Sequence, residues 1–313
     1  MLQYIARRLI ALVPILLGVT FITFMAAHLA PGDPVEIILG QRHDPAEHAR
    51  LLHVLGLDQP WWRQYLTFLW NALHLDFGNS YVLRDESVTS ILARGLPASL
   101  TLGLLSICLT VLIGIPLGIF MATKRGSWLD SGTALAMMVL YAIPTFVLIP
   151  ILRILDIKLY EHGWPYLPVA GWDGPRNAIF PVLIYTVGLL GFFSRITRSA
   201  MLEALRQDYV RTARAKGLRR AVILYKHAFR NALLPIVTVL GPLLAFLVSG
   251  SFVIEVLFNV PGVAFITISS IFQKDFPVVE ATTVLLAIVV TLVNLLTDLL
   301  YSAIDPRVRL QGK

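Results

Sequence analysis

No pattern of residues in the sequence predicts an enzyme active site. The only lysine that follows a glycine is Lys313, so the chain has no phosphate-binding P-loop. No histidine is followed by glutamate, which excludes the HExxH motif of zinc proteases, and no G-x-S-x-G sequence occurs. The sequence therefore assigns no catalytic residue to this chain.

Three histidines raise the question of a metal site. His43, His48 and His53 follow one another at intervals of five residues. On an α-helix each such step turns the side chain by about 140°, so the three do not share one face. The single cysteine, Cys108, excludes a thiolate cluster and an intrachain disulfide. We expect no metal site in this chain.

The most distinctive chemistry lies in a stretch that we call the basic loop, Arg195–Arg230, which holds ten Lys or Arg and two acids. Apolar side chains at three- and four-residue steps predict one amphipathic helix over Ser199–Gly217. The predicted apolar stripe consists of Leu202, Leu205, Tyr209 and Ala213. Gly217 is expected to end this helix, and a second basic amphipathic segment then begins at Leu218.

Three interpretations of the basic loop are open. A basic amphipathic helix can lie on anionic lipid, or it can bind nucleic acid, or its stripe can insert into a groove on a cytoplasmic partner. Small residues at Ala213, Ala215 and Gly217 favour the groove, because they allow close backbone approach.

These segments must be held in place by membrane-spanning helices. The chain of 313 residues is 57% apolar and 14% charged, whereas soluble domains are about 45–50% apolar and about 25% charged. Six segments are apolar enough, and long enough as helices, to cross about 30 Å of hydrocarbon. They are Leu9–Ala30, Ala98–Thr123, Ser131–Leu152, Asn177–Ser194, Asn231–Ile254 and Ala281–Thr297, the last continuing to Ile304. The predicted fold class is an all-α integral membrane protein.

The distribution of positive charge predicts the orientation of these spans. With the N-terminus inside, the inner segments hold 17 Lys or Arg and the outer segments hold 9. An excess of this kind marks the cytoplasmic side, so both termini are expected in the cytoplasm. The net charge of +7 then follows from topology, and we expect no nucleic acid partner.

Polar residues are scarce inside the predicted spans. Asn294 and Asp298 lie one helical turn apart in the sixth span. An acid within a span suggests a functional site by default, but here a structural bond to a neighbouring helix is the preferred interpretation. A proton- or ion-coupled relay would have few groups to use, so energy should come from elsewhere.

The long loop, residues 31–97, carries its own helix signals. Asp44 and Pro45 are typical of the start of a helix that Gly56 would end, and a second helix is expected from Pro60 toward His74. The second helix is rich in aromatic residues, which prefer the membrane–water boundary. It is either an interfacial anchor or a docking surface for an external partner.

Several motifs resemble one family. The run Asp208–Gly217 resembles the cytoplasmic coupling loop of ABC importer permeases, specifically those of the dipeptide/oligopeptide/nickel permease family. Further matching motifs are Pro31–Pro34, Leu55–Pro60, Asp76–Tyr81, Asn259–Gly262, Asp275–Val279, Asn294–Tyr301 and Asp305–Arg307. One departure is that Arg211-Thr212-Ala213 stands where the general importer loop has Glu-Ala-Ala, so no glutamate role is assigned.

The resemblance implies a subunit of a type I importer in the bacterial or archaeal inner membrane. Its partners would be a homologous second permease, two ABC ATPase subunits, an extracytoplasmic peptide-binding protein and membrane lipids. ATP and Mg would bind to the ATPases, with no cofactor in this chain. The cargo would be di- or oligopeptides, with nickel, glutathione or another small solute as alternatives. A secondary transporter is the competing class of protein.

The resemblance also divides the chain. Residues 1–94 would form the first span and an extracytoplasmic loop domain, 95–304 the type I core with the 195–230 coupling loop, and 305–313 a cytoplasmic tail. The residues that would couple to the ATPase are Leu205, Asp208, Tyr209, Arg211, Thr212, Ala213, Ala215, Lys216 and Gly217. Asn259, Pro261 and Gly262 would lie in an outer re-entrant loop toward the binding protein.

Overall fold

The computed structural model describes residues 2–40, 44–83, 86–248 and 252–304, with the side chains of 2–9, 11–12, 246–248, 298 and 300–304 left undescribed. The described chain is helical apart from loops and one isolated β-bridge between Asn79 and Ser87. It divides into two units. The first unit is Met1–Ser99 with Pro261–Thr291, and the second is Leu100–Val260 with Leu292–Lys313.

The first unit contains the long loop and its flanking helices. Its elements are α1 (Leu2–Leu29), α2 (Pro34–Leu39), α3 (Pro45–Val54), α4 (Trp61–Leu73), the start of α5 (Val88–Thr123), α13 (Val263–Phe272) and the start of α14 (Phe276–Ile304). The predicted start of α3 is confirmed, since the Asp44 side chain accepts a hydrogen bond of 2.9 Å from the Ala46 N–H. Gly56 ends this segment with a φ of 68°, a backbone angle that glycine adopts without strain.

A small apolar core joins the first turns of α5 to α14 in this unit. Val88, Ile91 and Leu92 pack with Val278 and Ala281. A close backbone contact lies beside the core, because a Cβ atom added to Gly95 would collide with Ile266 and lie 3.3 Å from the Gly262 carbonyl carbon. Glycine is therefore required here to let α5 meet the start of α13.

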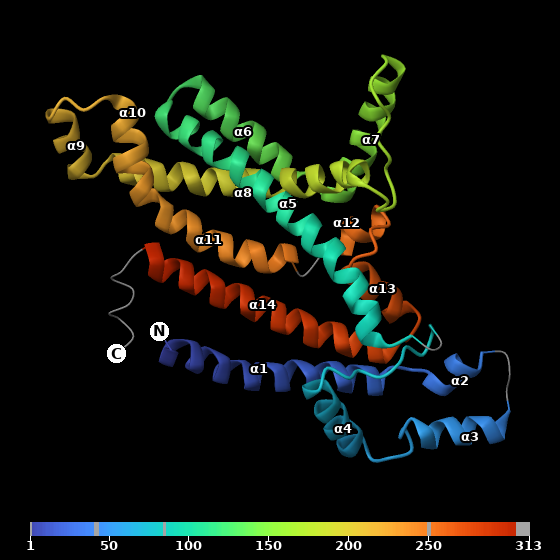
Figure 1. Ribbon diagram of the computed structural model, residues 1–313. Coiled ribbons are helices and arrows are strands. Elements are labelled where there is room, and N and C mark those ends of the chain that lie inside the picture. The colour runs from blue at the N-terminus through green and yellow to red at the C-terminus, as the bar shows by residue number, and fades with distance from the viewer. Residues whose placement is uncertain (1, 41–43, 84–85, 249–251, 305–313) are drawn as a thin grey trace. The chain divides into compact units, whose positions relative to one another are not determined.

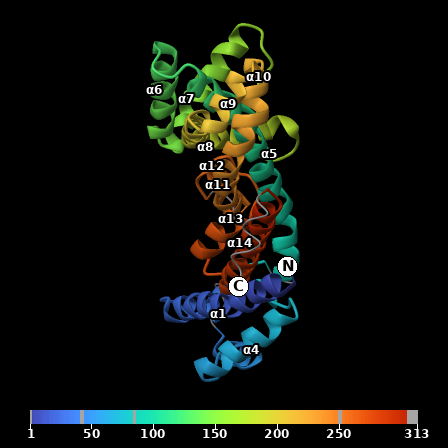
Figure 2. The ribbon, with the colours of Figure 1, turned by 90° about the vertical axis from the view of Figure 1, so that its left-hand side faces the viewer.

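The second unit is organised around α8. Its elements are the rest of α5, α6 (Trp128–Ala142), α7 (Thr145–Glu161), α8 (Pro175–Leu205), α9 (Asp208–Ala215), α10 (Arg220–Val222), the π-helix η1 (Ile223–Phe229), α11 (Arg230–Val248), α12 (Phe252–Leu257) and the end of α14. Helix α8 contacts α6, α7 and α11, and Figure 1 shows α6 and α11 on either side of it. Figures 1 and 2 both show α9 and α10 close together near one end of α8.

Glycines allow α5 to cross α8 closely. A Cβ atom on Gly114 would collide with the ring of Phe193. At Gly118 the added atom would collide with Thr197 and lie 2.8 Å from the backbone oxygen of Ser194. Gly114 and Gly118 thus serve helix packing, and Phe193 is fully buried beside them.

The predicted third span, Ser131–Leu152, is not one continuous helix. Helices α6 and α7 meet there at an angle of 106°. The break falls at Ile143 and Pro144, where Ile143 is extended with ψ 120°. A residue before proline avoids the helical region, which explains the break.

The structure supports the predicted spans unevenly. Four helices are long and apolar enough to cross a membrane, and a fifth if α6 and α7 form one bent span, with only the described residues considered. Helix α1 is not one of these helices, because the apolar stretch considered in it, Val13–Leu29, is shorter. The predicted fifth span runs through residues 249–251, which lie outside the described residues, as does the 305–313 tail. The count of six spans stays a prediction.

Candidate functional sites in the basic loop and the long loop

The helix predicted over Ser199–Gly217 is wrong, because the structure breaks it into two. Helix α8 ends at Leu205, Gln207 is extended with ψ 153°, and α9 begins at Asp208. Leu202 and Leu205 pack from α8 against the main core of the second unit. The predicted stripe therefore does not form one face of one helix.

Helix α9 has an inward and an outward face. Val210 and Ala213 are buried and pack against Ile223 of η1. Tyr209 remains 38% exposed, although the sequence placed it on the same stripe as Ala213. The break moves the apolar face by one position, so that Val210 rather than Tyr209 points inward.

Gly217 ends the α9 segment as predicted. Its φ is 71°, its N–H donates to Arg214 O at 2.9 Å, and Leu218 N–H donates to Ala213 O at 3.3 Å. This pair of bonds is the Schellman motif, which satisfies the last carbonyls of a helix. Two residues later the chain enters α10 and then the seven-residue π-helix η1. The loop thus folds back on itself over a short distance.

The remaining residues predicted to couple to an ATPase lie on the surface of this loop. They are Asp208, Arg211, Thr212, Ala215, Lys216 and Gly217, all exposed. Arg211 and Asp208 form an ion pair at 3.3 Å that is open to solvent and contributes little to stability. An exposed, short helix with a C-terminal cap and polar side chains outward is free to contact another protein.

An ion pair that the sequence analysis missed fixes the start of α6 to α8. Arg198 donates to both oxygens of Asp130, from Nε at 2.7 Å and from Nη2 at 2.6 Å. Asp130 is buried and also accepts from the Gly126 N–H at 3.2 Å. A bidentate pair of this kind is geometrically specific. It ties the α5–α6 turn to the helix that leads into the basic loop.

In the first unit, motifs that are far apart in sequence meet. Asp275 is buried and accepts hydrogen bonds from the Ser80 hydroxyl and, at 3.0 Å, from the Tyr81 N–H. Next to it, Lys274 Nζ donates to the Pro31 carbonyl at 2.6 Å. The segments 31–34, 76–81 and 275–279 are thereby joined. No local pattern in the sequence predicts these pairings.

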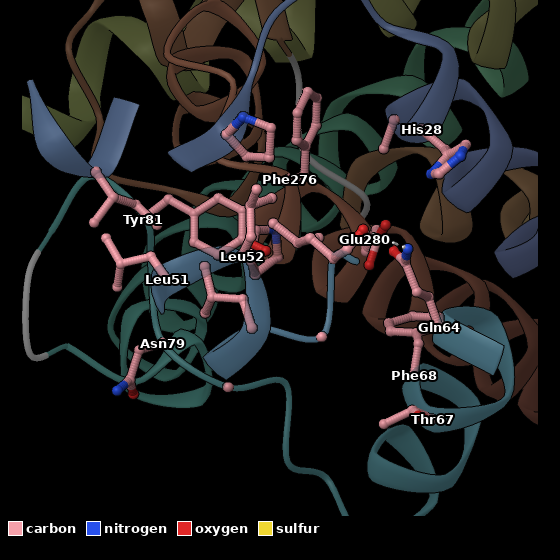
Figure 3. Close-up of a pocket in the computed structure, with 18 of the residues that line it drawn as sticks. His28, Leu51, Leu52, Gln64, Thr67, Phe68, Asn79, Tyr81, Phe276 and Glu280 are labelled. Carbon is pink, nitrogen blue, oxygen red and sulfur yellow. Dashed lines mark hydrogen bonds between the residues drawn. The ribbon is translucent and has the colours of Figure 1, made fainter. Parts of the chain in front are cut away.

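The joined segments line a cavity of about 1060 Å³, which we call the long-loop cavity. Its walls include Gly32, Asp33, Gly56, Asp76, Tyr81 and Glu280. Figure 3 shows Leu51 and Leu52 of α3, Gln64 and Phe68 of α4, and Phe276 of α14 among the side chains around it. The volume is at the upper end of the range for small-molecule sites, and the mixed aromatic and polar lining is typical of them.

Two groups give the long-loop cavity its electrostatic character. The Asp33 carboxylate caps α2 at Val35 N–H (2.8 Å) and accepts from His48 Nε2 at 2.7 Å. Burial alone would raise the pKa of Asp33, but these hydrogen bonds outweigh burial and lower the pKa below its usual 3.8. Burial and the nearby carboxylates of Glu280 and Asp275 raise the pKa of the Tyr81 phenol above its usual 10.0, so the hydroxyl stays protonated.

The histidines of the long loop have separate partners. His48 bonds to Asp33, and His53 bonds to Asp58 at 2.9 Å. His43 lies outside the described residues. Within the described part of the chain, no group of three His, Cys, Asp or Glu side chains is placed to hold a metal ion.

The outer-loop residues are divided between the two units. In the second unit, Asn259 has a φ of 51° and follows the end of α12, where Val260 N–H donates to Glu255 O at 2.9 Å. In the first unit, Pro261 and Gly262 precede α13, whose first N–H, at Val263, donates to the Ser99 hydroxyl at 2.8 Å. The structure thus gives the predicted loop well-defined ends, and its role stays a prediction.

The predicted intramembrane polar pair is described only in part. Asn294 lies in α14 with an exposed side chain, and Asp298 lies one turn further along the same helix. The side chain of Asp298 is outside the described residues, so a bond to a neighbouring helix stays a prediction.

Comparison with known protein families gives two matches that together span nearly the whole chain. Residues 1–103 match the N-terminal model of the "Binding-prot-dependent transport system membrane comp". Residues 114–310 match the "Binding-protein-dependent transport system inner membrane component".

Curated relatives match over their full length. The chain is 37% identical to the "Dipeptide transport system permease protein DppB" of Escherichia coli (strain K12), covering 99% of both chains. It is 36% identical to the "Oligopeptide transport system permease protein AppB" of Bacillus subtilis (strain 168), covering 98% of this chain and 99% of that one.

Among solved structures, the chain is similar to one of the inward-facing MetNI methionine ABC transporter. The match has a TM-score of 0.57 and 21% identity, and covers 69% of this chain and 96% of that chain. The likeness confirms the predicted type I ABC importer transmembrane fold.

Proposed function

This chain belongs to the family of binding-protein-dependent transport system inner membrane components, and we propose that it is the permease subunit of an ATP-driven importer of di- and oligopeptides. It is accordingly a multi-pass protein of the bacterial inner membrane. The observation that carries the proposal is full-length similarity to relatives named as dipeptide and oligopeptide permeases.

The partners follow from this role. The proposal requires a homologous second permease and two ABC ATPase subunits, which bind ATP and Mg and hydrolyse the nucleotide. A binding protein delivers the peptide from outside. This chain then contributes the transport path and mechanical coupling, and no catalytic residue.

The ATPase docks on the outward face of α9 in this proposal. Tyr209 is exposed there, while Val210 and Ala213 attach the helix to η1. A short helix packed on the next segment moves with it as one body, so closure of the ATPase dimer is transmitted to α11. The permease pair then changes from inward-open to outward-open, and hydrolysis resets it.

The binding protein docks on the first unit, around the long-loop cavity. Support comes from the convergence of the segments 31–34, 76–81 and 275–279 on that cavity. The segment 76–81 is fixed by hydrogen bonds to buried Asp275 and the segment 31–34 by the hydrogen bond from Lys274 to the Pro31 carbonyl, so they present a preformed surface. Pro261 and Gly262, which belong to the same unit, contact the same partner in this proposal, and Asn259 precedes them in the chain.

Copurification and reconstitution test the proposal. The complex of both permeases and both ATPases is reconstituted with the binding protein, and uptake of a labelled dipeptide is measured with ATP inside. Uptake must require every subunit. Transport of peptide by this chain alone would indicate a secondary transporter, and uptake of nickel or glutathione without peptide would assign the alternative cargo.

A single substitution tests the docking face. Tyr209→Asp is expected to abolish peptide-stimulated ATP turnover while the chain still inserts in the membrane. Ala213→Asp is a poorer probe, because Ala213 is buried inside this chain and the change would disturb packing. Unchanged coupling in Tyr209→Asp would refute docking at this face.

A further inference from the structure

A second cavity, distinct from the long-loop cavity, lies in the second unit beside the basic loop. We call it the arginine cavity. Its volume is about 610 Å³. Four arginines line it. Arg125 follows α5, Arg206 follows α8, Arg214 lies in α9 and Arg220 begins α10. Four separate segments of the chain thus each contribute an exposed arginine to the lining of one cavity.

The arginine cavity has no internal counter-charge among the residues described as lining it. The lining contains no Asp or Glu. In the same region Arg198 and Arg211 pair with Asp130 and Asp208. In the described chain the four lining arginines form no ion pair within 4.0 Å, and Arg125 alone interacts at longer range with Asp130. Like charges held together repel, so an anion that enters between them is stabilised.

The floor of the arginine cavity is apolar. It is formed by Ala122, Leu202, Leu205, Leu218, Ile223 and Leu224. A ligand that fits both parts must carry an anionic group and an apolar body. Guanidinium groups favour phosphate in particular, because their planar fork donates two parallel hydrogen bonds to its oxygens.

The position of the cavity favours a lipid over a soluble phosphate compound. Helix α5 is a candidate membrane span, and its last residue, Thr123, both lines the cavity and ends the predicted span Ala98–Thr123. Span ends lie at the level of the lipid head groups, where basic pockets bind anionic lipid. The π-helix η1 forms part of the wall through Ile223 and Leu224, and π-helical turns occur frequently at functional sites.

We propose that the arginine cavity binds the phosphate group of an anionic phospholipid, with the start of an acyl chain on the apolar floor. The occupant lies behind α9, while Tyr209 on the outward face remains available to the ATPase. Lipid in this position props the α9–η1 segment against α8. Coupling then depends on the anionic lipid content of the membrane.

The test uses the whole complex in nanodiscs of phosphatidylcholine with or without phosphatidylglycerol. The variant is Arg125→Gln with Arg206→Gln, both outside α9. The control is Arg195→Gln with Arg219→Gln, which removes the same charge from exposed arginines that do not line the cavity. Phosphatidylglycerol that stays bound is counted by native mass spectrometry, and thermal unfolding confirms that each variant is folded.

We expect retention of phosphatidylglycerol to fall by about fivefold for each lining arginine removed, and not in the control. Equal retention in all three proteins would overturn the proposal. Loss of the ATPase subunits with unchanged lipid retention would assign the cavity to the ATPase instead. A third outcome is that inorganic phosphate stabilises the complex in pure phosphatidylcholine, that this stabilisation requires the lining arginines, and that phosphatidylglycerol has no effect. The ligand of the cavity would then be a free anion and not a lipid.

Discussion

In the long loop, the segments that form the cavity come from opposite ends of the chain, whereas the α9–η1 part of the basic loop is closed by contacts between near neighbours. Ser80 and Asp275 are 195 residues apart, but Gly217 bonds to Arg214 and α9 packs on η1 a few residues later. The long loop is therefore fixed by buried polar contacts between motifs. The α9–η1 part of the basic loop is fixed by a C-terminal cap and by one small apolar contact, whereas the start of the loop packs in the main core and pairs Arg198 with Asp130.

This difference suits two kinds of partner contact. A surface set by distant, buried hydrogen bonds is rigid and can present a preformed site to a protein that arrives from solution. A short, locally folded helix can move as one body with the segment on which it packs. Substitutions should therefore have different consequences in the two regions.

The largest effect is expected from Asp275→Ala in the first unit. It leaves the Ser80 hydroxyl and the Tyr81 N–H without their buried acceptor, which should cost about 3 kcal/mol of stability. Faster proteolysis within 76–83 and a lower unfolding temperature would show it. The matched change in the basic loop, Asp208→Ala, removes an exposed carboxylate and should shift stability by less than about 0.5 kcal/mol. Equal losses of stability in Asp275→Ala and Asp208→Ala would contradict the proposed difference between the two regions.

The close crossing of α5 and α8 should be nearly as sensitive. Gly118→Ala places a methyl group against the backbone oxygen of Ser194, which cannot yield as a side chain could, and should cost about 2 kcal/mol. Gly132→Ala in α6, where no atom lies within 4 Å, is the control and should be neutral or stabilising. Thermal unfolding of the two purified variants compares them. If Gly118→Ala left the unfolding temperature unchanged, α5 and α8 would have to lie further apart than described.

A smaller and purely local effect is expected at the end of α9. Gly217→Ala forces a residue with a Cβ atom into a left-handed conformation and should cost about 1 kcal/mol. Gly217→Asn should recover part of this loss, because asparagine tolerates that conformation. Hydrogen exchange of α9 measures the change. An effect that spreads to the first unit would contradict the local character of the loop.

The smallest effect concerns pH and the long loop. The pKa of Asp33 is lowered in the folded chain, so its carboxylate stabilises the fold above its usual pKa of 3.8, and this contribution disappears as pH falls through the lowered value. Asp33→Asn keeps the helix cap but loses the charge. The variant should be less stable than the parent by at most about 1 kcal/mol at pH 6, with no difference at strongly acid pH. If the stability difference between the variant and the parent grew as the pH fell, the Asp33 carboxylate would not stabilise the fold in the way expected.

The sequence was informative where structure depends on nearby residues. Asp44, Pro45 and Gly56 predicted α3, and Gly217 predicted the end of α9, because capping is set within a few residues. The break between Leu205 and Asp208 was missed, because the spacing of apolar residues alone does not show where one helix ends and the next begins. The break within Ser131–Leu152 was also missed, and the 106° angle there depends on how α6 and α7 pack.

The cavities could not be predicted for a related reason. Asp275 binding Ser80, Asp130 binding Arg198 and the four arginines around one space are all consequences of tertiary folding. The motifs did indicate which segments were of interest, because they carried the family resemblance. Their meeting around one cavity required the structure.

The hydrogen bond between Ser80 and Asp275 also bears on the order of synthesis. A ribosome has completed the entire long loop well before it reaches Asp275, and domains generally begin to fold from the N-terminus as they emerge. Here the segment around Ser80 cannot complete its folding at once, because its hydrogen-bond acceptor, Asp275, is synthesised about 195 residues later. Until then the segment around Ser80 has exposed polar groups and apolar side chains without partners. Chains that lack Asp275 or fail to fold its segment would thus leave the region around Ser80 open to proteolysis.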